Sequence, residues 1–139
     1  MKLDKQDHRL LVLWATNCAE RVLPSFEKEH PDDTRPRRAV EAGRSFVRSE
    51  ITMSEARAAA FAAHAAARAV DDAEARAAAR SAGHAAATAH VADHAVHAAA
   101  YAVCAVPDID AARAREHDWQ YQNLPKYLQP LVFPDQIAQ

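Results

Sequence analysis

Alanine dominates the middle of the chain, where 27 of the 50 residues between positions 56 and 105 are alanine. Alanine has the highest intrinsic helix propensity, and its small side chain lets neighbouring helices approach closely. A sheet protein would need β-branched residues and turn glycines, yet the whole chain contains only two glycines and 6% aromatic residues. The sequence therefore predicts an all-α protein with alanine-rich central helices.

The length and charge of the chain narrow the class of protein further. A chain of 139 residues suits one domain. Its 17 basic and 19 acidic residues give a formal net charge of -2, which argues against a dedicated nucleic-acid-binding protein. The longest alanine-rich stretch carries an aspartate and several histidines, which are too costly for a membrane span. We therefore expect a cytoplasmic protein with no nucleic-acid partner and no membrane partner.

Hydrophobic spacing and capping signals predict a single bundle of five to six helices over residues 1–124. Thr52 and Glu55 have the spacing of a capping box before one of these helices. A helical pattern over residues 72–106 is long for one helix, so we expect it to break or bend at residues 81–83, around Gly83. The expected helices cover residues 4–22, 24–29, 34–50, 53–70, 72–106 and 108–123.

Residues 125–139 form a separate tail that contains several prolines and large apolar residues. Prolines interrupt regular structure, so we expect no helix or strand in this segment. Its apolar side chains need a partner surface. The tail is expected either to pack on the bundle or to contribute to an interface, such as that of a homodimer.

Histidines cluster between positions 84 and 97 in a stretch that contains no lysine, arginine or glutamate. On a helix that turns about 100° per residue, His90, His94 and His97 share one face. Tyr101 continues this stripe and Asp93 flanks it. Imidazoles therefore carry most of the polarity of this region, and we expect His90 and His94 to form the polar centre of the protein.

Three roles for this stripe remain open from the sequence. Its histidines could be structural groups on a partly solvated face, a partner-binding surface, or a metal or catalytic site. Histidines at positions i and i+4 can both ligate a divalent transition metal such as Zn²⁺. His64 could add a ligand from the preceding helix, and Asp93 could ligate or orient a histidine. The identity of any cofactor is left open.

A second stripe runs along the expected helix 53–70, where Arg57, Phe61, His64 and Arg68 share one face. Two cations beside a histidine can receive an acid, either Asp93 or an acidic partner; the alternative is a solvated face. Arg57, Arg68, His84 and Tyr101 are secondary candidates for the site. Neither a glycine-rich phosphate loop nor a nucleophile elbow is present in the sequence, which favours a non-enzymatic role without deciding it.

Three stretches of the sequence resemble one known family. They are DHRLLVLWATNCAERVLPSFE, RPRRAVEAGRSFVRSEITMSEARAAAFAAHAAARA and AARSAGHAAATAHVADHAVHAAAYA. They are similar to small helical bacterial immunity proteins with an Imm-five-like domain, and the resemblance runs from about Asp7 to Leu124. It implies a role in neutralising a toxin of a polymorphic toxin system, and it carries over no catalytic residue.

The function expected from the sequence is therefore a small cytoplasmic binding protein that neutralises a partner toxin by direct binding. The alternative is a histidine- or metal-dependent helical enzyme or a small-ligand-binding protein. In that case His90, Asp93, His94 and His97 would line its pocket.

Overall fold

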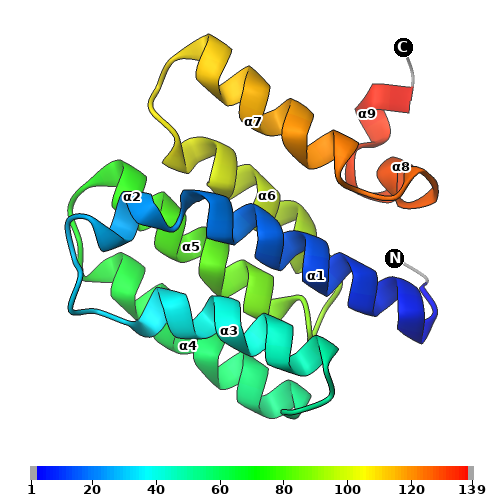
Figure 1. Ribbon diagram of the computed structural model, residues 1–139, viewed down its shortest axis with the longest axis horizontal. Helices are drawn as coiled ribbons and strands as arrows, with labels where there is room; N and C mark the ends of the chain where they lie inside the picture. Colours follow the sequence, from blue (N-terminus) through cyan, green and yellow to red (C-terminus); the bar gives the residue numbers. More distant parts are fainter. Residues whose placement is uncertain (1–2, 138–139) are drawn as a thin grey trace.

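The computed structural model describes residues 3–137, and within this range every regular element is a helix (Figure 1). The all-α prediction is therefore confirmed. The elements are α1 (Lys5–Val22), α2 (Pro24–Glu27), α3 (Arg35–Val47), α4 (Met53–Arg68), α5 (Ala73–Ala87), α6 (His94–Ala105), α7 (Asp110–Gln122), the 3₁₀ helix η1 (Lys126–Leu128), α8 (Gln129–Val132) and α9 (Pro134–Ile137).

The predicted count of five to six helices is slightly too low for the described range. The difference comes mainly from the C-terminal segment, where we expected no regular structure. Pro130 and Pro134 each occupy the first turn of a short helix, where the missing N–H of proline costs no hydrogen bond. The prolines of this segment therefore begin helices and do not exclude them.

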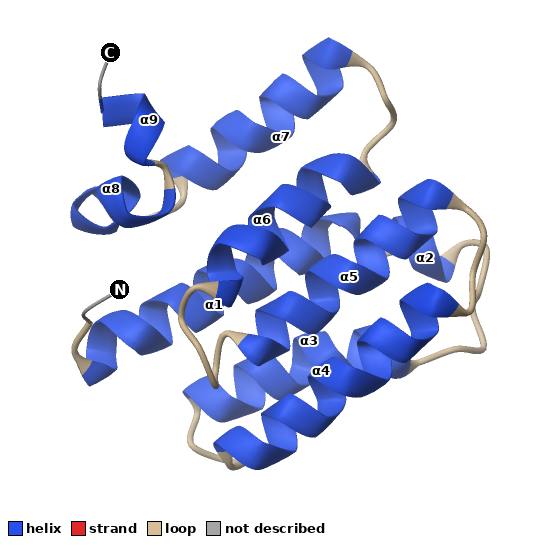
Figure 2. Cartoon of the chain, turned by 180° about the vertical axis from the view of Figure 1, so that it is seen from behind, coloured by secondary structure: helices blue, strands red, loops and turns tan. Residues whose placement is uncertain are grey.

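The helices form two layers (Figures 1 and 2). One layer contains α1, α2 and α3, and the other contains α4, α5 and α6, which face the viewer in Figure 2. Helix α5 lies at the centre of the packing, because it contacts α4 and α6 beside it and α1, α2 and α3 in the other layer. The three helices α4, α5 and α6 therefore present a common outer face.

Alanine makes this close packing of α5 feasible. The side chains of Ala78, Ala79, Ala82, Ala85 and Ala86 are all fully buried along one helix. Small side chains let helix backbones approach closely, so that dispersion contacts between many atoms replace the burial of a few bulky groups. The prediction of alanine-rich central helices rests on this ability of alanine to let helices pack closely.

The break in the long helical pattern lies later than predicted. Helix α5 continues through Gly83 to Ala87, and α6 begins only at His94. The side chain of Thr88 donates a hydrogen bond to the carbonyl of His84 at the end of α5 (2.8 Å). The cost of a glycine within a helix is only about 1 kcal/mol, and the surrounding buried alanines outweigh it. Residues 88–93 therefore connect α5 and α6.

The helix starts predicted from capping residues are only partly confirmed. The capping box of Thr52 and Glu55 is present at the start of α4, and Asp72 caps α5 by accepting from the backbone N–H of Ala75 (3.0 Å). Helix α7 begins at Asp110 after an N-cap Ile109 that makes no side-chain cap, so the predicted start at Asp108 was wrong.

Helix α7 and the C-terminal segment pack against the start of the chain. The indole N–H of Trp14 donates to the carbonyl of Gln120 in α7 (2.9 Å), and the rings of Trp14 and Phe133 meet edge to face (5.8 Å). Leu128 and Val132 are buried in the main core cluster. Tyr127 and Leu131 stay exposed, and the hydroxyl of Tyr127 donates a hydrogen bond to the carboxylate of Asp7 (2.8 Å).

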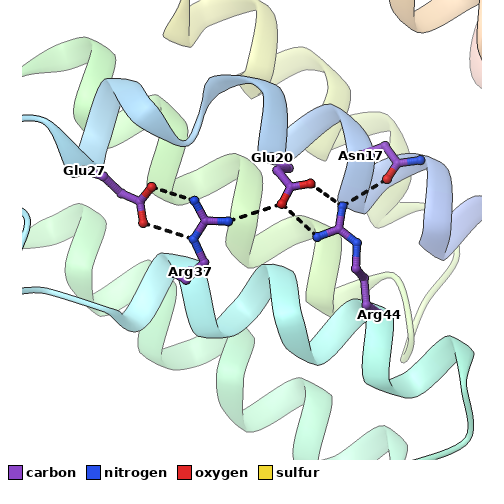
Figure 3. A network of polar contacts seen from close by, with 5 residues as sticks. All are labelled: Asn17, Glu20, Glu27, Arg37 and Arg44. Atoms are coloured by element: carbon purple, nitrogen blue, oxygen red, sulfur yellow. Dashed lines mark hydrogen bonds and ion pairs between the residues drawn. The ribbon is translucent and has the colours of Figure 1, made fainter.

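A network of ion pairs joins the three helices of the first layer (Figure 3). Arg37 of α3 donates two hydrogen bonds to Glu27 (2.7 and 3.1 Å) and one to Glu20 of α1 (3.2 Å). Arg44 donates to both carboxylate oxygens of Glu20 (3.0 and 2.5 Å) and to the side-chain oxygen of Asn17 (3.2 Å). Arg44, followed by Arg37, lowers the pKa of Glu20. Arg37 and Arg44 therefore link α3 to α1 and α2.

None of the helices in the described range is both long enough and apolar enough to cross a bilayer.

Candidate functional site

A pocket of about 240 Å³ lies where α4 meets the end of α5 and the start of α6. Three of the five leading site candidates from the sequence, His64, His90 and His94, line it together with the secondary candidate Arg57. The remaining wall is apolar and consists of Phe61 and two alanines, Ala60 and Ala87. The structure thus brings together residues that are far apart in the sequence. At the rim, His90 contacts Met53, which lies 37 positions earlier in the chain.

His64 fits into this site because position 83 of the facing helix is glycine. A Cβ atom at Gly83 would lie 2.7, 2.8 and 3.0 Å from Cε1, Nε2 and Nδ1 of the His64 ring. Ordinary van der Waals contact requires more space, so any larger residue would displace the imidazole. Gly83, which we expected to break the helix, instead provides the surface on which His64 packs.

Arg80 fixes the protonation of His64. The Nη1 of Arg80 lies 3.0 Å from Nδ1 of His64. A guanidinium group can only donate, so Nδ1 must accept and a neutral His64 carries its hydrogen on Nε2. No residue in the described part of the chain forms a hydrogen bond with that Nε2. Within the described residues this N–H therefore has no acceptor, and the ring edge that carries it packs against Gly83.

His84 of α5 lies at the centre of an aromatic cluster behind the pocket. Its ring centroid is 4.8 Å from that of His64 and 5.2 Å from those of His94 and His97. The Tyr101 ring stacks on His84 at 5.4 Å with an interplanar angle of 6°. His84 Nδ1 lies 3.0 Å from His94 Nδ1, so one of these nitrogens donates and the other accepts.

Burial keeps the inner histidines of this cluster uncharged. Desolvation, with a further contribution from the charge of Arg80, lowers the pKa of His64 to about 4. Desolvation together with neighbouring His64 and His94 lowers the pKa of His84 to about 3. The pKa of His94 is also lowered, first by burial, although the carboxylate of Asp93 opposes this effect. Near neutral pH the cluster therefore acts through neutral donors and acceptors.

The rim of the pocket is exposed and combines apolar side chains with Arg57 and His90. Phe61 is 59% exposed, and the guanidinium carbon of Arg57 lies 5.2 Å from the centre of its ring. Met53 and Val91 are also exposed, and the Met53 sulfur lies 3.3 Å from Nδ1 of His90. We call four residues, Met53, Arg57, Phe61 and His90, the pocket rim.

The predicted helical stripe is wrong for His90. This residue lies in the connection before α6, so it does not share a helix face with His94 and His97. His94 and His97 do lie on α6 one turn apart, with ring centroids separated by 6.2 Å. His97 contacts His84 and does not line the pocket. The helical projection failed because it assumed one continuous helix through residues 88–93.

The other candidates have peripheral positions. Asp93 is exposed at the N-cap of α6, where its side chain makes no capping hydrogen bond. Arg68 is exposed on α4, and its charge contributes to the low pKa of His64.

Arg80 was not among the site residues predicted from the sequence, and the packing of His64 on Gly83 was not predicted either. The spacing of Arg80, Gly83 and His84 places all three on one face of α5, which was the available signal.

The geometry of the described residues does not favour a metal centre. No group of three or more histidine, cysteine, aspartate or glutamate side chains in the range 3–137 is arranged to hold a metal ion. Nδ1 of His64 accepts from Arg80, and the Nδ1 atoms of His84 and His94 bond to each other. These nitrogens serve the packing of the cluster.

The family model described as Imm-5 like putative immunity protein matches residues 1–127. This range includes every helix from α1 to α7 and all the residues of the pocket and its rim. Neither the curated proteins nor the solved structures contain a significant match to the chain.

Proposed function

The chain belongs to the Imm-5 like family of immunity proteins, and from this premise we propose that it neutralises a partner toxin by binding to it directly. The observation that carries the proposal is the family match, which extends over the complete bundle. In this proposal the chain acts in the cytoplasm of the cell that makes the toxin. Neutralisation by binding needs a surface and not a set of reacting groups.

The outer face of α4, α5 and α6 is the best candidate for that surface. It exposes two aromatic rings, Phe61 of α4 and Tyr101 of α6, together with Met53 and Arg57. Aromatic residues, methionine and arginine are enriched in protein interfaces, and aromatic and arginine side chains contribute many of the energetically dominant contacts. The exposed side chains of this face therefore have the composition of a binding site.

Co-expression tests the proposal in a cell. A candidate toxin from the genome that encodes this chain is induced in a sensitive bacterium with and without the chain. We expect the toxin alone to stop growth, and co-expression of the chain to restore it. A toxin from an unrelated system is the control and should remain active. Growth arrest that persists despite abundant folded chain would overturn the proposal.

A second candidate function is the binding of a small ligand in the histidine pocket. The observation in its favour is the convergence of Arg57, His64, His90 and His94 on one cavity. Thermal unfolding measured in the presence of a panel of small organic anions tests it. A rise in melting temperature that disappears in the Arg57→Gln variant would support this function, and the absence of any rise would count against it.

A further inference from the structure

The pocket combines a cation, a hydrogen-bond donor and an apolar rim, and these features together define what can fill it. The cation is Arg57. In the part of the chain that the structure describes, six arginines form ion pairs with carboxylates, namely Arg21, Arg35, Arg37, Arg44, Arg48 and Arg113. Arg57 forms none there, and its guanidinium group rests on the exposed ring of Phe61.

The charges around His64 have the same sign. Arg57 lines the pocket beside His64, Arg80 bonds to its ring, and Arg68 acts on it electrostatically. Glu55, which lies near Arg57 on α4, is engaged in the capping box with Thr52. The three arginines outnumber the carboxylate of Asp93, which acts on the pocket-lining His94. A site with this excess of positive charge disfavours a further cation and favours an anion.

His64 supplies the donor. Because Arg80 occupies Nδ1, the hydrogen of the neutral ring is on Nε2, where no described residue accepts it. A carboxylate is a strong acceptor for both an imidazole N–H and a guanidinium group. Arg57 and His64 thus offer two kinds of donor to one anionic group.

The dimensions and the rim indicate that the anion belongs to a protein. The volume of about 240 Å³ is below the roughly 300–1,000 Å³ that is typical of small-molecule pockets. Exposed Phe61 and Met53 lie at the opening. Such a rim can pack against a partner surface and exclude water from a central charged contact, as in the centre of many interfaces.

We infer that the pocket receives the carboxylate of one aspartate or glutamate side chain of the toxin, which pairs with Arg57 and accepts a hydrogen bond from Nε2 of His64. This inference rests on the proposed function and identifies the chemistry of its partner. The pocket rim contacts the toxin around this anchor. The carboxylate of this toxin residue pairs with Arg57, which forms no ion pair with a described carboxylate of its own chain.

Calorimetric titration of the purified toxin with the full chain tests the inference. The Arg57→Gln variant removes the charge at an exposed helix position and is expected to fold normally, which circular dichroism checks. We expect its affinity for the toxin to fall at least about tenfold. The Arg38→Gln variant, which removes an exposed arginine from α3 in the other layer, is the matched control and should bind within about twofold of the wild type.

The toxin carboxylate is identified by changing each surface aspartate and glutamate of the toxin to its amide. One such change should weaken binding to the wild-type chain but have no further effect on binding to Arg57→Gln. If the toxin binds the wild type and Arg57→Gln equally well, the pocket inference is wrong while the proposed function stands. If the toxin does not bind the wild type, both are wrong.

Discussion

The imidazole of His64 lies directly against Gly83 of the neighbouring helix, with the position of a Cβ on residue 83 only 2.7 Å from Cε1 of the ring. This contact joins α4 to α5 at the back of the candidate site. It also explains why a glycine persists within a helix that consists largely of alanine.

The Gly83→Ala substitution tests this contact. Alanine favours a helix over glycine by about 1 kcal/mol, so an unconstrained position would become more stable. We expect the opposite, a loss of about 1–3 kcal/mol in the free energy of unfolding, because the new methyl group displaces His64. Urea denaturation measures the change.

The His64→Ala background provides the control for this experiment. Without the imidazole the methyl group has space, so Gly83→Ala should stabilise the double variant relative to His64→Ala alone. The sign of the effect should therefore reverse between the two backgrounds. A stabilising Gly83→Ala change in the wild type would show that His64 does not constrain this position.

The low pKa values of the buried histidines predict a pH-dependent stability. In the unfolded chain a histidine has a pKa of about 6.5, whereas the pKa is about 4 for His64 and about 3 for His84 in the folded protein. The unfolded state therefore binds more protons as the pH falls below 6.5. The contribution of these residues is fully present above this pH and is lost progressively down to their folded pKa values.

The double variant His64→Gln, His84→Gln should lose much of this dependence. We expect the free energy of unfolding to vary less between pH 6.5 and 5 than in the wild type, since few carboxylates titrate in that window. Chemical denaturation at each pH measures it. Equal slopes for the double variant and the wild type would refute the assignment.

The network around Glu20 predicts a modest, salt-sensitive contribution to stability. Glu20→Gln removes the charge that Arg37 and Arg44 share. The side chain of Glu20 is 42% exposed, so solvent screens the pairs and we expect a loss of only about 1 kcal/mol. The loss should shrink in 1 M salt. Glu29→Gln, an exposed residue outside the network, should change stability little, and an equal loss there would argue against a specific network.

The exposure of Phe61 predicts that removing its ring weakens toxin binding without reducing the stability of the chain. Phe61→Ala should leave the free energy of unfolding within about 0.5 kcal/mol, because the ring is exposed, yet weaken toxin binding by about tenfold or more. Ile109→Ala is a matched control, since Ile109 is 60% exposed and Phe61 59%. The two variants should differ in calorimetric affinity for the toxin. Equal affinities would place the binding surface elsewhere.

Local signals in the sequence were sufficient for the fold class and for several helix starts. Alanine density and the capping box of Thr52 act over a few residues, so they could be interpreted without knowledge of tertiary packing. The position of the break near residue 90 could not be predicted in this way. It depends on how the buried alanines at the end of α5 pack, which outweighs the weak helix propensity of Gly83.

The sequence predicted several residues of the candidate site but not how these residues are arranged. His64, His94 and Arg57 were recognised from their spacing on helices, but the central position of His84 depends on the packing of α4 and α6 on either side of α5. His90 was misplaced for the same reason, because its position follows from the loop and not from a helical period. Tertiary register, which a single helix pattern does not contain, determines which histidines meet.

The most direct test of neutralisation by binding is inhibition of the purified toxin by the purified chain. The activity of the toxin is measured while the chain is added in increasing amounts, and the mixture is then analysed by size-exclusion chromatography with light scattering. We expect activity to fall to zero when a stoichiometric complex has formed, and the complex to elute as one species. A toxin that stays fully active in excess chain, with the two proteins eluting separately, would contradict it.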